Sequence, residues 1–337
     1  MKSYLQNHPV LTFLGINFAW TWLFWLGAIP LRSDRLLLTA LVMIGGFGPA
    51  LAGVLTLGFS APRRPTGINF KRLWAGLGFA GLLLAVFAVR YAVGNIPALD
   101  ALANDLRLTV PVLAAAAAAA AVGGWVYSSA FSSQASVRER MASLLPRGRS
   151  LRWGLAALFF YPALILLAWG LAALLGLGVE FPGLWGRSAQ ETLPLYALIF
   201  TLTALAQGGN EEPGWRGFLQ PELEKRFSPL AAALWVSVAW SLWHLPLYLN
   251  GFYGQELVGG MLGGFIFRIL LSIFLAWAYR RSGGSLFAMI LLHTSFNCMV
   301  NFLPTSDVGL LILWVLTAAA VVIGAKMWQK PRPNPAG

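Results

Sequence analysis

The sequence predicts an all-α membrane protein, a polytopic transmembrane helical bundle of about eight to ten spans with both termini cytoplasmic. Of its 337 residues, 58% are hydrophobic and only 11% are charged, whereas a soluble globular protein carries about 25% charged residues. The apolar residues fall into stretches of roughly 20, the length that an α-helix needs to cross a hydrocarbon core. These observations exclude a soluble enzyme and a disordered chain.

The candidate spans follow one another with short connections. They lie near residues 10–30, 36–59, 73–94, 108–129, 153–178, 194–222, 229–249, 257–280, 284–303 and 307–328. The fourth is the weakest, because its centre is the run from Ala114 to Ala121 and alanine is barely apolar enough to drive insertion. The first is longer than the apolar part of a signal peptide, so we expect it to be retained.

The net charge of +12 indicates orientation in a membrane rather than nucleic-acid binding. Most Lys and Arg residues fall in alternate connections, as expected when cytoplasmic loops concentrate positive charge. The longest of these connections carries Arg138, Arg140, Arg147, Arg149 and Arg152. We therefore expect an integral multi-pass protein of the plasma membrane that contacts the lipid bilayer and binds no nucleic acid.

Polar residues within apolar segments divide the chain into three parts. We expect N-terminal transmembrane helices of unassigned role over 1–190, a catalytic helical core over 191–305, and a last span with a basic cytoplasmic tail over 306–337. Ionisable groups in hydrocarbon are costly, so those found there are functional candidates. Nearly all of them lie in the second part.

The first polar motif is the run GGNEEPGWRG at residues 208–217. Its glycines, asparagine and proline are expected to interrupt a helix, and broken membrane helices usually line cavities. Glu212 and Arg216 are four residues apart and can pair on one helix face. Glu211 points about 100° away and is available for another task. The alternative for both acids is a solvated helix end.

Two of the three histidines lie inside apolar segments. His244 belongs to the run WSLWHLP, and His293 to the run HTSFN, in which Asn297 follows four residues later. Residues four apart project from one face of a helix, so His293 and Asn297 share a face. Each histidine taken alone is as compatible with a packing residue as with a catalyst.

The predicted turns bring these groups to one depth. Glu211 lies about 16 residues before the turn at 227–229 and His244 about 16 after it, so at about 1.5 Å per residue both reach the same level. Asn297 lies at a similar distance past the next cytoplasmic turn. We expect the four side chains to form one layer within the membrane, which argues against a solvated helix end.

That layer contains the groups that hydrolysis of a carbonyl compound needs. Glu211 is a candidate general base that can deprotonate a water together with His244. His293 and the amide of Asn297 can donate hydrogen bonds to the oxyanion of a tetrahedral intermediate. The combination predicts a hydrolase that attacks a carbonyl with water, most naturally a peptide bond.

In this order, the motifs Glu-Glu-x-x-aromatic-Arg-Gly, aromatic-x-x-x-His and His-x-x-x-Asn resemble those of the CPBP family of intramembrane proteases. That family includes the type II CAAX prenyl endopeptidases and the bacteriocin-processing or immunity proteins. The resemblance covers roughly residues 195–303. Trp215 and Trp240 stand where phenylalanine is frequent in the family, but both are aromatic, so these differences do little to weaken the resemblance.

The resemblance implies catalytic roles for four residues and a structural or charge-balancing role for two. The implied assignment is water activation by Glu211 and His244, oxyanion stabilisation by His293 and Asn297, and support by Glu212 and Arg216.

Metal dependence has two alternatives. Glu211, His244 and His293 could form a Zn²⁺ site with an open position. However, neither histidine belongs to an H-E-x-x-H run, and no carboxylate is evident to orient the imidazoles, as zinc ligands usually require. We favour direct activation of water by Glu211 and His244 with no cofactor required, and zinc stays as the alternative.

Arg268 is a further supporting candidate, since it lies near the depth of the layer, about 12 residues before Arg280. It either balances Glu211 and Glu212, binds the free C-terminal carboxylate of a substrate tail, or pairs elsewhere. The expected partner is a peptide or a membrane-associated protein tail, lipidated or not.

The alternative class is a non-catalytic membrane scaffold of the immunity type, or a transporter, that retains the polar layer. A transporter should show related halves with broken helices at corresponding positions. Here the polar features lie only in the second half, which disfavours transport.

Overall fold

The computed structural model describes residues 2–60, 68–94, 106–254 and 257–330. Across these ranges the regular structure is helical, apart from an isolated antiparallel bridge between Glu180 and Thr305. Nine of the described helices are long and apolar enough to span a membrane, and a tenth apolar helix is shorter. The predicted all-α bundle is confirmed. The end of the predicted tail, residues 331–337, lies outside the described residues.

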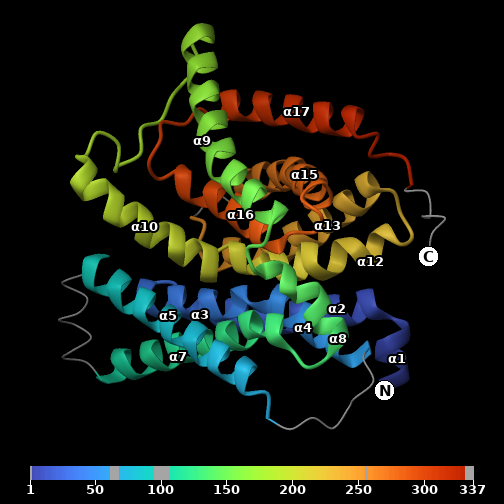
Figure 1. Ribbon diagram of the computed structural model, residues 1–337. Coiled ribbons are helices and arrows are strands. Elements are labelled where there is room, and N and C mark those ends of the chain that lie inside the picture. Colours follow the sequence, from blue (N-terminus) through green and yellow to red (C-terminus); the bar gives the residue numbers. More distant parts are fainter. Residues whose placement is uncertain (1, 61–67, 95–105, 255–256, 331–337) are drawn as a thin grey trace.

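The N-terminal helices lie together on one side of the molecule, coloured blue to green in Figure 1. Their bounds are α1 Lys2–Asn7, α2 Pro9–Gly27, α3 Arg35–Gly46, α4 Gly48–Ser60, α5 Phe70–Gly94, α7 Leu106–Ser128 and α8 Ala135–Met141. Short 3-10 turns extend three of these segments, at Ile29–Leu31, Ser129–Phe131 and Ala142–Leu144.

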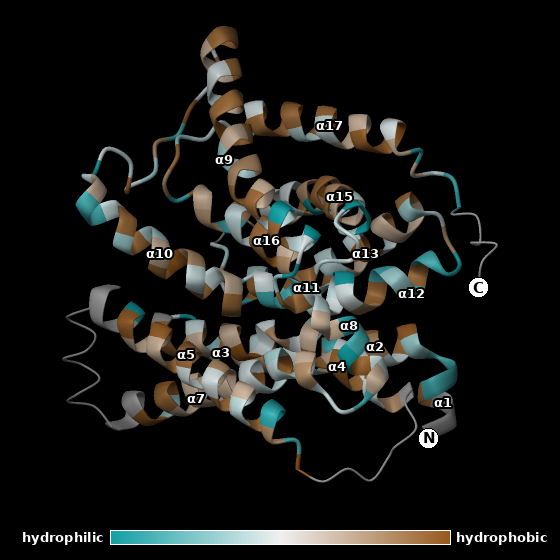
Figure 2. Cartoon of the chain, in the orientation of Figure 1, coloured by the Kyte–Doolittle hydropathy of each residue, from teal (hydrophilic) through white to brown (hydrophobic). Residues whose placement is uncertain are grey.

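The remaining helices, green to red in Figure 1, form the other side, where α9 packs against α16 and α17. Their bounds are α9 Arg149–Leu175, α10 Ala189–Ala206, α11 Glu212–Gly214, α12 Gln220–Glu224, α13 Pro229–Trp243, α14 Leu245–Leu249, α15 Leu257–Arg281, α16 Leu286–Met299 and α17 Asp307–Gly324. Figure 2 shows brown, hydrophobic residues along the long helices, with teal residues at α1, α12 and the start of α10.

The predicted span 36–59 is broken where it meets the polar motif. It is divided into α3 and α4, which begins at Gly48. A Cβ on Gly48 would collide with Thr21 Oγ1, and a Cβ on Gly214 would collide with the backbone of Pro49. These close approaches need glycine, because any side chain would overlap backbone or fixed atoms. The α4 backbone therefore lies directly against α11.

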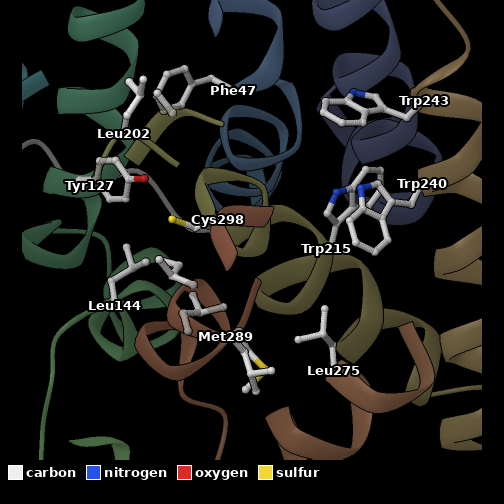
Figure 3. Close-up of a cluster of buried hydrophobic side chains, with 14 of the residues drawn as sticks. Phe47, Tyr127, Leu144, Leu202, Trp215, Trp240, Trp243, Leu275, Met289 and Cys298 are labelled. Atoms are coloured by element: carbon white, nitrogen blue, oxygen red, sulfur yellow. The ribbon is translucent and has the colours of Figure 1, made fainter. Parts of the chain in front are cut away.

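Large aromatic side chains fill the centre of the bundle. Trp215, Trp240 and Trp243 are buried in the core, and Figure 3 shows them above Leu275 and Met289. Trp215 and Trp243 meet edge to face, with ring centroids 5.9 Å apart. Such packing adds to the stabilisation from area burial alone. The core thus begins directly behind the polar motif.

Candidate active site

A cavity of about 500 Å³ lies in the bundle beside the polar motif, and Glu211, His244, His293 and Asn297 all line it. The first three are buried, with exposed fractions of 7%, 6% and 3%. They come from the segment after α10, the end of α13, and α16. The structure therefore brings together the side chains that the sequence predicts to lie in one layer, at the surface of a single cavity.

The chain between α10 and α12 is irregular, as its glycines and proline predict. A 3-10 turn at Gly209–Glu211 leads into α11, and a π-helix at Trp215–Leu219 follows. Gly208 has φ +142°, where L side chains are rare, and a Cβ there would collide with Asn297 Nδ2. Glycine thus lets the backbone pass close to α16 and turns Glu211 toward the cavity.

Glu211 accepts two hydrogen bonds on the same oxygen. The indole nitrogens of Trp240 and Trp215 donate to Oε2 over 2.7 Å and 3.1 Å. This arrangement leaves Oε1 for a group in the cavity. Phenylalanine at either position would pack as a ring but could not donate these hydrogen bonds.

Glu212 lies behind the cavity and is fully buried. Its Oε1 is 3.2 Å from Arg216 Nη1, which confirms the pair predicted from the four-residue spacing. The same oxygen is 2.7 Å from His293 Nδ1. The expectation that no carboxylate orients an imidazole is therefore wrong. Glu212 and His293 are 81 residues apart in sequence, so no local pattern shows this contact.

His244 ends α13 as its C-terminal cap, and its ring is oriented by the backbone of the same helix. Nδ1 is 2.7 Å from the carbonyl oxygen of Trp240. Because a carbonyl only accepts, Nδ1 carries the proton and the neutral ring has its lone pair at Nε2. The ring also meets Trp243 edge to face at 4.7 Å. His244 is thus held as the tautomer that a general base requires.

Trp240 contacts Glu211, Arg216 and His293. Its indole donates to Glu211, and the guanidinium of Arg216 lies over its ring, 4.9 Å from the centroid. The His293 ring meets it edge to face at 5.3 Å. Figure 3 shows Trp240 beside Trp215, with both nitrogens on the same side. Trp240 therefore lies between the buried Glu212–Arg216 pair and the cavity, and it holds Glu211, the acid that faces the cavity.

Asn297 lies one helical turn beyond His293 on α16, and its Nδ2 donates to the carbonyl oxygen of Gln207 over 3.3 Å. His293 Nδ1 is occupied by Glu212, so Nε2 is the ring atom that reaches the Gly208 segment. The amide and the imidazole therefore both approach the same stretch of backbone at the cavity wall.

Arg268 lies on α15, lines the cavity and is 8% exposed. Its Nη2 is 3.5 Å from Tyr248 Oη. Among the described residues no ion pair includes Arg268. The described ion pairs of Glu212 are with Arg216 and His293, and the alternative in which Arg268 balances Glu211 and Glu212 stays a prediction.

The N-terminal helices hold the site in place, a role that the sequence leaves unassigned. Asn210 Nδ2 donates to the carbonyl oxygen of Gly46 over 3.0 Å, and Trp243 Nε1 donates to Thr21 Oγ1 over 2.7 Å. Polar residues such as Thr21 inside a first apolar span are the signal that could have indicated this contact. Such bonds fix the motif against α2 and α3.

The side chains considered for zinc are Glu211, His244 and His293, which all line the cavity. Among the described residues, no group of three or more His, Cys, Asp or Glu side chains is arranged to hold a metal ion. The described donors therefore do not fit a three-ligand zinc site.

The segment that forms the site is similar to known proteins. Residues 193–299 match the family described as type II CAAX prenyl endopeptidase Rce1-like. The chain is similar to CAAX prenyl protease 2 of Methanococcus maripaludis, with 27% identity over 179 residues. That alignment covers 50% of this chain and 64% of the relative, so the chain spans less than two thirds of the relative's length. Residues 193–299, which contain Glu211, His244, His293 and Asn297, are thus the part of the chain that is similar to the CAAX prenyl endopeptidase family.

Proposed function

We propose that this protein is an intramembrane endopeptidase that hydrolyses a peptide bond in a peptide or a membrane-associated protein tail. The observation that carries the proposal is the single cavity lined by Glu211, His244, His293 and Asn297. The match to a protease family over residues 193–299 supports it independently. We also assign the protein to the cell membrane, on the basis of its apolar helices.

Water activation is assigned to Glu211 and His244. Glu211 has Oε2 held by two indoles, so Oε1 is the atom that accepts a proton from water. His244 Nε2 accepts a hydrogen bond from the other water hydrogen. The water oxygen then bonds to the scissile carbonyl carbon, and the carbonyl oxygen becomes an oxyanion.

The oxyanion is assigned to His293 and Asn297. Glu212 binds Nδ1 of His293, and its negative charge balances a ring that carries protons on both nitrogens. Nε2–H of His293 and the Asn297 amide then donate to the oxyanion. When the carbon–nitrogen bond breaks, the proton held by Glu211 passes to the leaving amine.

The proposed chemistry is of the glutamate type, without a bound metal. It is supported by the arrangement of the described residues, among which no group of three or more His, Cys, Asp or Glu side chains could hold a metal ion. Zinc held by Glu211, His244 and His293 is the competing mechanism. Removal of metal by a strong chelator distinguishes the two.

The cavity wall fits an apolar substrate segment. Besides the polar layer, the wall includes Val42, Ile199, Leu202, Leu247, Phe252, Phe267 and Leu271. Lipidation of the substrate is a further proposal, taken from the prenyl protease to which the chain is similar. Matched peptides with and without a prenyl group test it directly.

The test of function uses the purified full-length protein in lipid vesicles with a library of apolar peptides. Cleavage products are identified by mass spectrometry, and Glu211→Gln is the control. We expect cleavage by the wild-type protein and none by the variant. A wild-type protein that cleaves nothing, while folded and monodisperse, would favour the scaffold alternative.

A further inference from the structure

A second cavity, of about 450 Å³, lies where the first turn of α5, the chain after α7, and α8 meet, and we call it the basic pocket. The charged residues that line it are Lys71, Arg138, Glu139 and Arg147, so three positive charges and one negative charge give it a formal charge of +2. Among the described residues, none of the three cations forms an ion pair. The basic pocket therefore presents uncompensated positive charge to a ligand.

The basic pocket lies at the end of the bundle that the sequence predicts to be cytoplasmic. The helices α5 and α7 are antiparallel neighbours, so the start of α5 and the end of α7 lie at the same end. Figure 2 shows hydrophilic, teal residues at the start of α5 and on α8. At the cytoplasmic surface of a membrane, anionic lipids attract Lys and Arg, and basic pockets between spans bind lipid headgroups.

Short contacts hold the cations of the basic pocket in position. Arg138 Nη1 donates to the carbonyl oxygen of Ser132 over 3.0 Å, which leaves the other guanidinium nitrogens for a ligand. Asn69 Nδ2 donates to the carbonyl oxygen of Phe131 over 2.8 Å and ties the start of α5 to the chain after α7. Lys71 Nζ lies 5.0 Å from the centroid of the Phe131 ring. The two cations thus reach one space from two segments that are joined by hydrogen bonds.

The side of α5 next to the basic pocket is apolar and exposed. Phe70 and Trp74 have exposed fractions of 62% and 68%, and Leu73 between them is also exposed. Because α5 is one of the helices long and apolar enough to span a membrane, these side chains are suited to contact lipid. A phospholipid can place its phosphate in the basic pocket and its acyl chains along α5. A soluble phosphate compound would leave this apolar surface unused.

We propose that the basic pocket binds the phosphate headgroup of an anionic phospholipid. A guanidinium binds phosphate through paired, charge-assisted hydrogen bonds, and a lysine binds it as a point charge. The formal charge of +2 favours a lipid with net negative charge over a zwitterionic lipid. This inference goes beyond the proposed peptidase function, and its test requires no cleavage.

A lipid in the basic pocket would also bear on stability, because α8 packs against neighbouring parts of the bundle. Ser136 Oγ on α8 donates to the carbonyl oxygen of Leu57 over 3.2 Å. A Cβ on Gly217, in the π-helix after the polar motif, would lie 3.3 Å from Met141 Cε at the end of α8. A ligand that binds only the folded state stabilises it, so lipid binding should raise the Tm of the protein.

The test measures lipid binding by native mass spectrometry of the full-length protein in detergent. Phosphatidylglycerol is compared with phosphatidylcholine that carries the same acyl chains. For the wild-type protein we expect phosphatidylglycerol to bind roughly 10- to 50-fold more tightly, at about 5-fold for each uncompensated cation. The double variant Lys71→Gln/Arg138→Gln should bring this ratio close to one, since it removes both excess charges. Equal binding of the two lipids by the wild-type protein would overturn the inference.

The matched control is the double variant Arg149→Gln/Arg152→Gln. Both arginines are exposed in the first turn of α9, and neither lines the basic pocket. This variant changes the net charge of the protein by the same amount, so it should leave the lipid ratio unchanged. An equal loss of preference in the two double variants would indicate general attraction by surface charge and would contradict a specific site.

Inorganic phosphate distinguishes a lipid headgroup from a soluble anion. An excess of phosphate, added at constant ionic strength, should not displace phosphatidylglycerol, because it cannot use the apolar side of α5. Displacement would assign the basic pocket to a soluble anion and would overturn the lipid assignment.

Lys71→Gln alone keeps the result decisive should the double variant not fold. The Lys71 side chain is exposed and lies over the Phe131 ring, so its loss should disturb the fold little. We expect the lipid ratio to fall about 5-fold. Phosphatidylglycerol should also raise the Tm of this variant less than that of the wild-type protein. A wild-type ratio together with a wild-type rise in Tm would refute the proposal.

Discussion

Glu211 and Glu212 are neighbours in sequence, yet they belong to different regions of the molecule. Glu211 faces the cavity, and its contacts are the uncharged indoles of Trp215 and Trp240. Glu212 lies in the wall behind the cavity, between Arg216 and His293. One acid is oriented by neutral donors with an oxygen left available, while the other is bound by a guanidinium and an imidazole.

This difference suits Glu211 for the reaction and Glu212 for holding its neighbours in place. A carboxylate held by a buried arginine gives up stabilisation if it takes a proton, so it is suited to hold charge in place. A carboxylate held by neutral donors in a cavity can accept and return a proton during a reaction. Glu212, in the wall behind the cavity, orients His293. Glu211, on the cavity face, performs the chemistry that we propose.

The largest expected effect comes from substitution on the cavity face. Glu211→Gln should lower the rate of peptide cleavage by roughly 10³-fold, because the amide cannot act as a general base. Its oxygen can still accept from the indoles, so the unfolding free energy should change little. Single-turnover cleavage and denaturant titration in micelles measure the two quantities. Appreciable cleavage by this variant would break the comparison.

Substitution in the wall should act on stability. Glu212→Gln leaves Arg216 buried without its partner and should lower the free energy of unfolding by about 3–5 kcal/mol. The control is Glu222→Gln, which breaks the Glu222–Lys225 pair, where the lysine is 64% exposed. Surface pairs contribute less than about 1 kcal/mol. Equal losses in the two variants would show that the wall is no more dependent on its charges than the surface.

The indole donors sharpen the comparison. Trp240→Phe keeps an aromatic ring under Arg216 but removes the 2.7 Å hydrogen bond to Glu211. We expect kcat to fall roughly 10-fold with little change in KM, as for loss of a hydrogen bond to a charged group. Trp243→Phe is the control, since that indole donates to Thr21. A similar fall in kcat for both variants would indicate a general packing effect.

The packing of the wall on the N-terminal helices gives a smaller effect. Gly214→Ala should lower the free energy of unfolding by about 1–3 kcal/mol, because the added methyl meets the backbone of Pro49. Gly263→Ala is the control, since a Cβ there has nothing within 4 Å. Denaturant titration of both variants measures the difference. Equal stability would mean that α4 and α11 can move apart without cost.

The smallest effect should follow removal of metal. Exhaustive treatment with a strong chelator should leave cleavage unchanged, because the proposed chemistry uses only Glu211 and His244 to activate water. Metal analysis of the treated protein verifies removal, and a zinc peptidase assayed in parallel verifies the chelator. Loss of cleavage that is restored by added zinc would contradict the prediction and would indicate that Glu211 is a metal ligand instead of a general base.

Prediction from sequence succeeded where the physics is local. The break after α10 follows from Gly208, Gly209 and Pro213, and the Glu212–Arg216 pair follows from helical spacing. The common cavity of Glu211 and His244 agrees with their equal separation from one turn. Each of these inferences uses distances along one or two helices, which a sequence determines directly.

Prediction failed where contacts join distant segments. The contact between Glu212 and His293 crosses 81 residues, and the bond from Asn210 to Gly46 crosses 164. Trp240 was recognised as aromatic, but its role depends on where the indole nitrogen points. The direction of the Trp240 indole nitrogen cannot be predicted from sequence periodicity, because it results from the packing of whole helices.

The sequence alone determined that this is a helical membrane protein with an acid, two imidazoles and an amide at similar depth, because hydropathy and helical rise act residue by residue. Only the tertiary structure decided which acid faces the cavity and which is bound by arginine. Those outcomes depend on the rotation and close approach of helices, where glycines and indoles from separate segments meet.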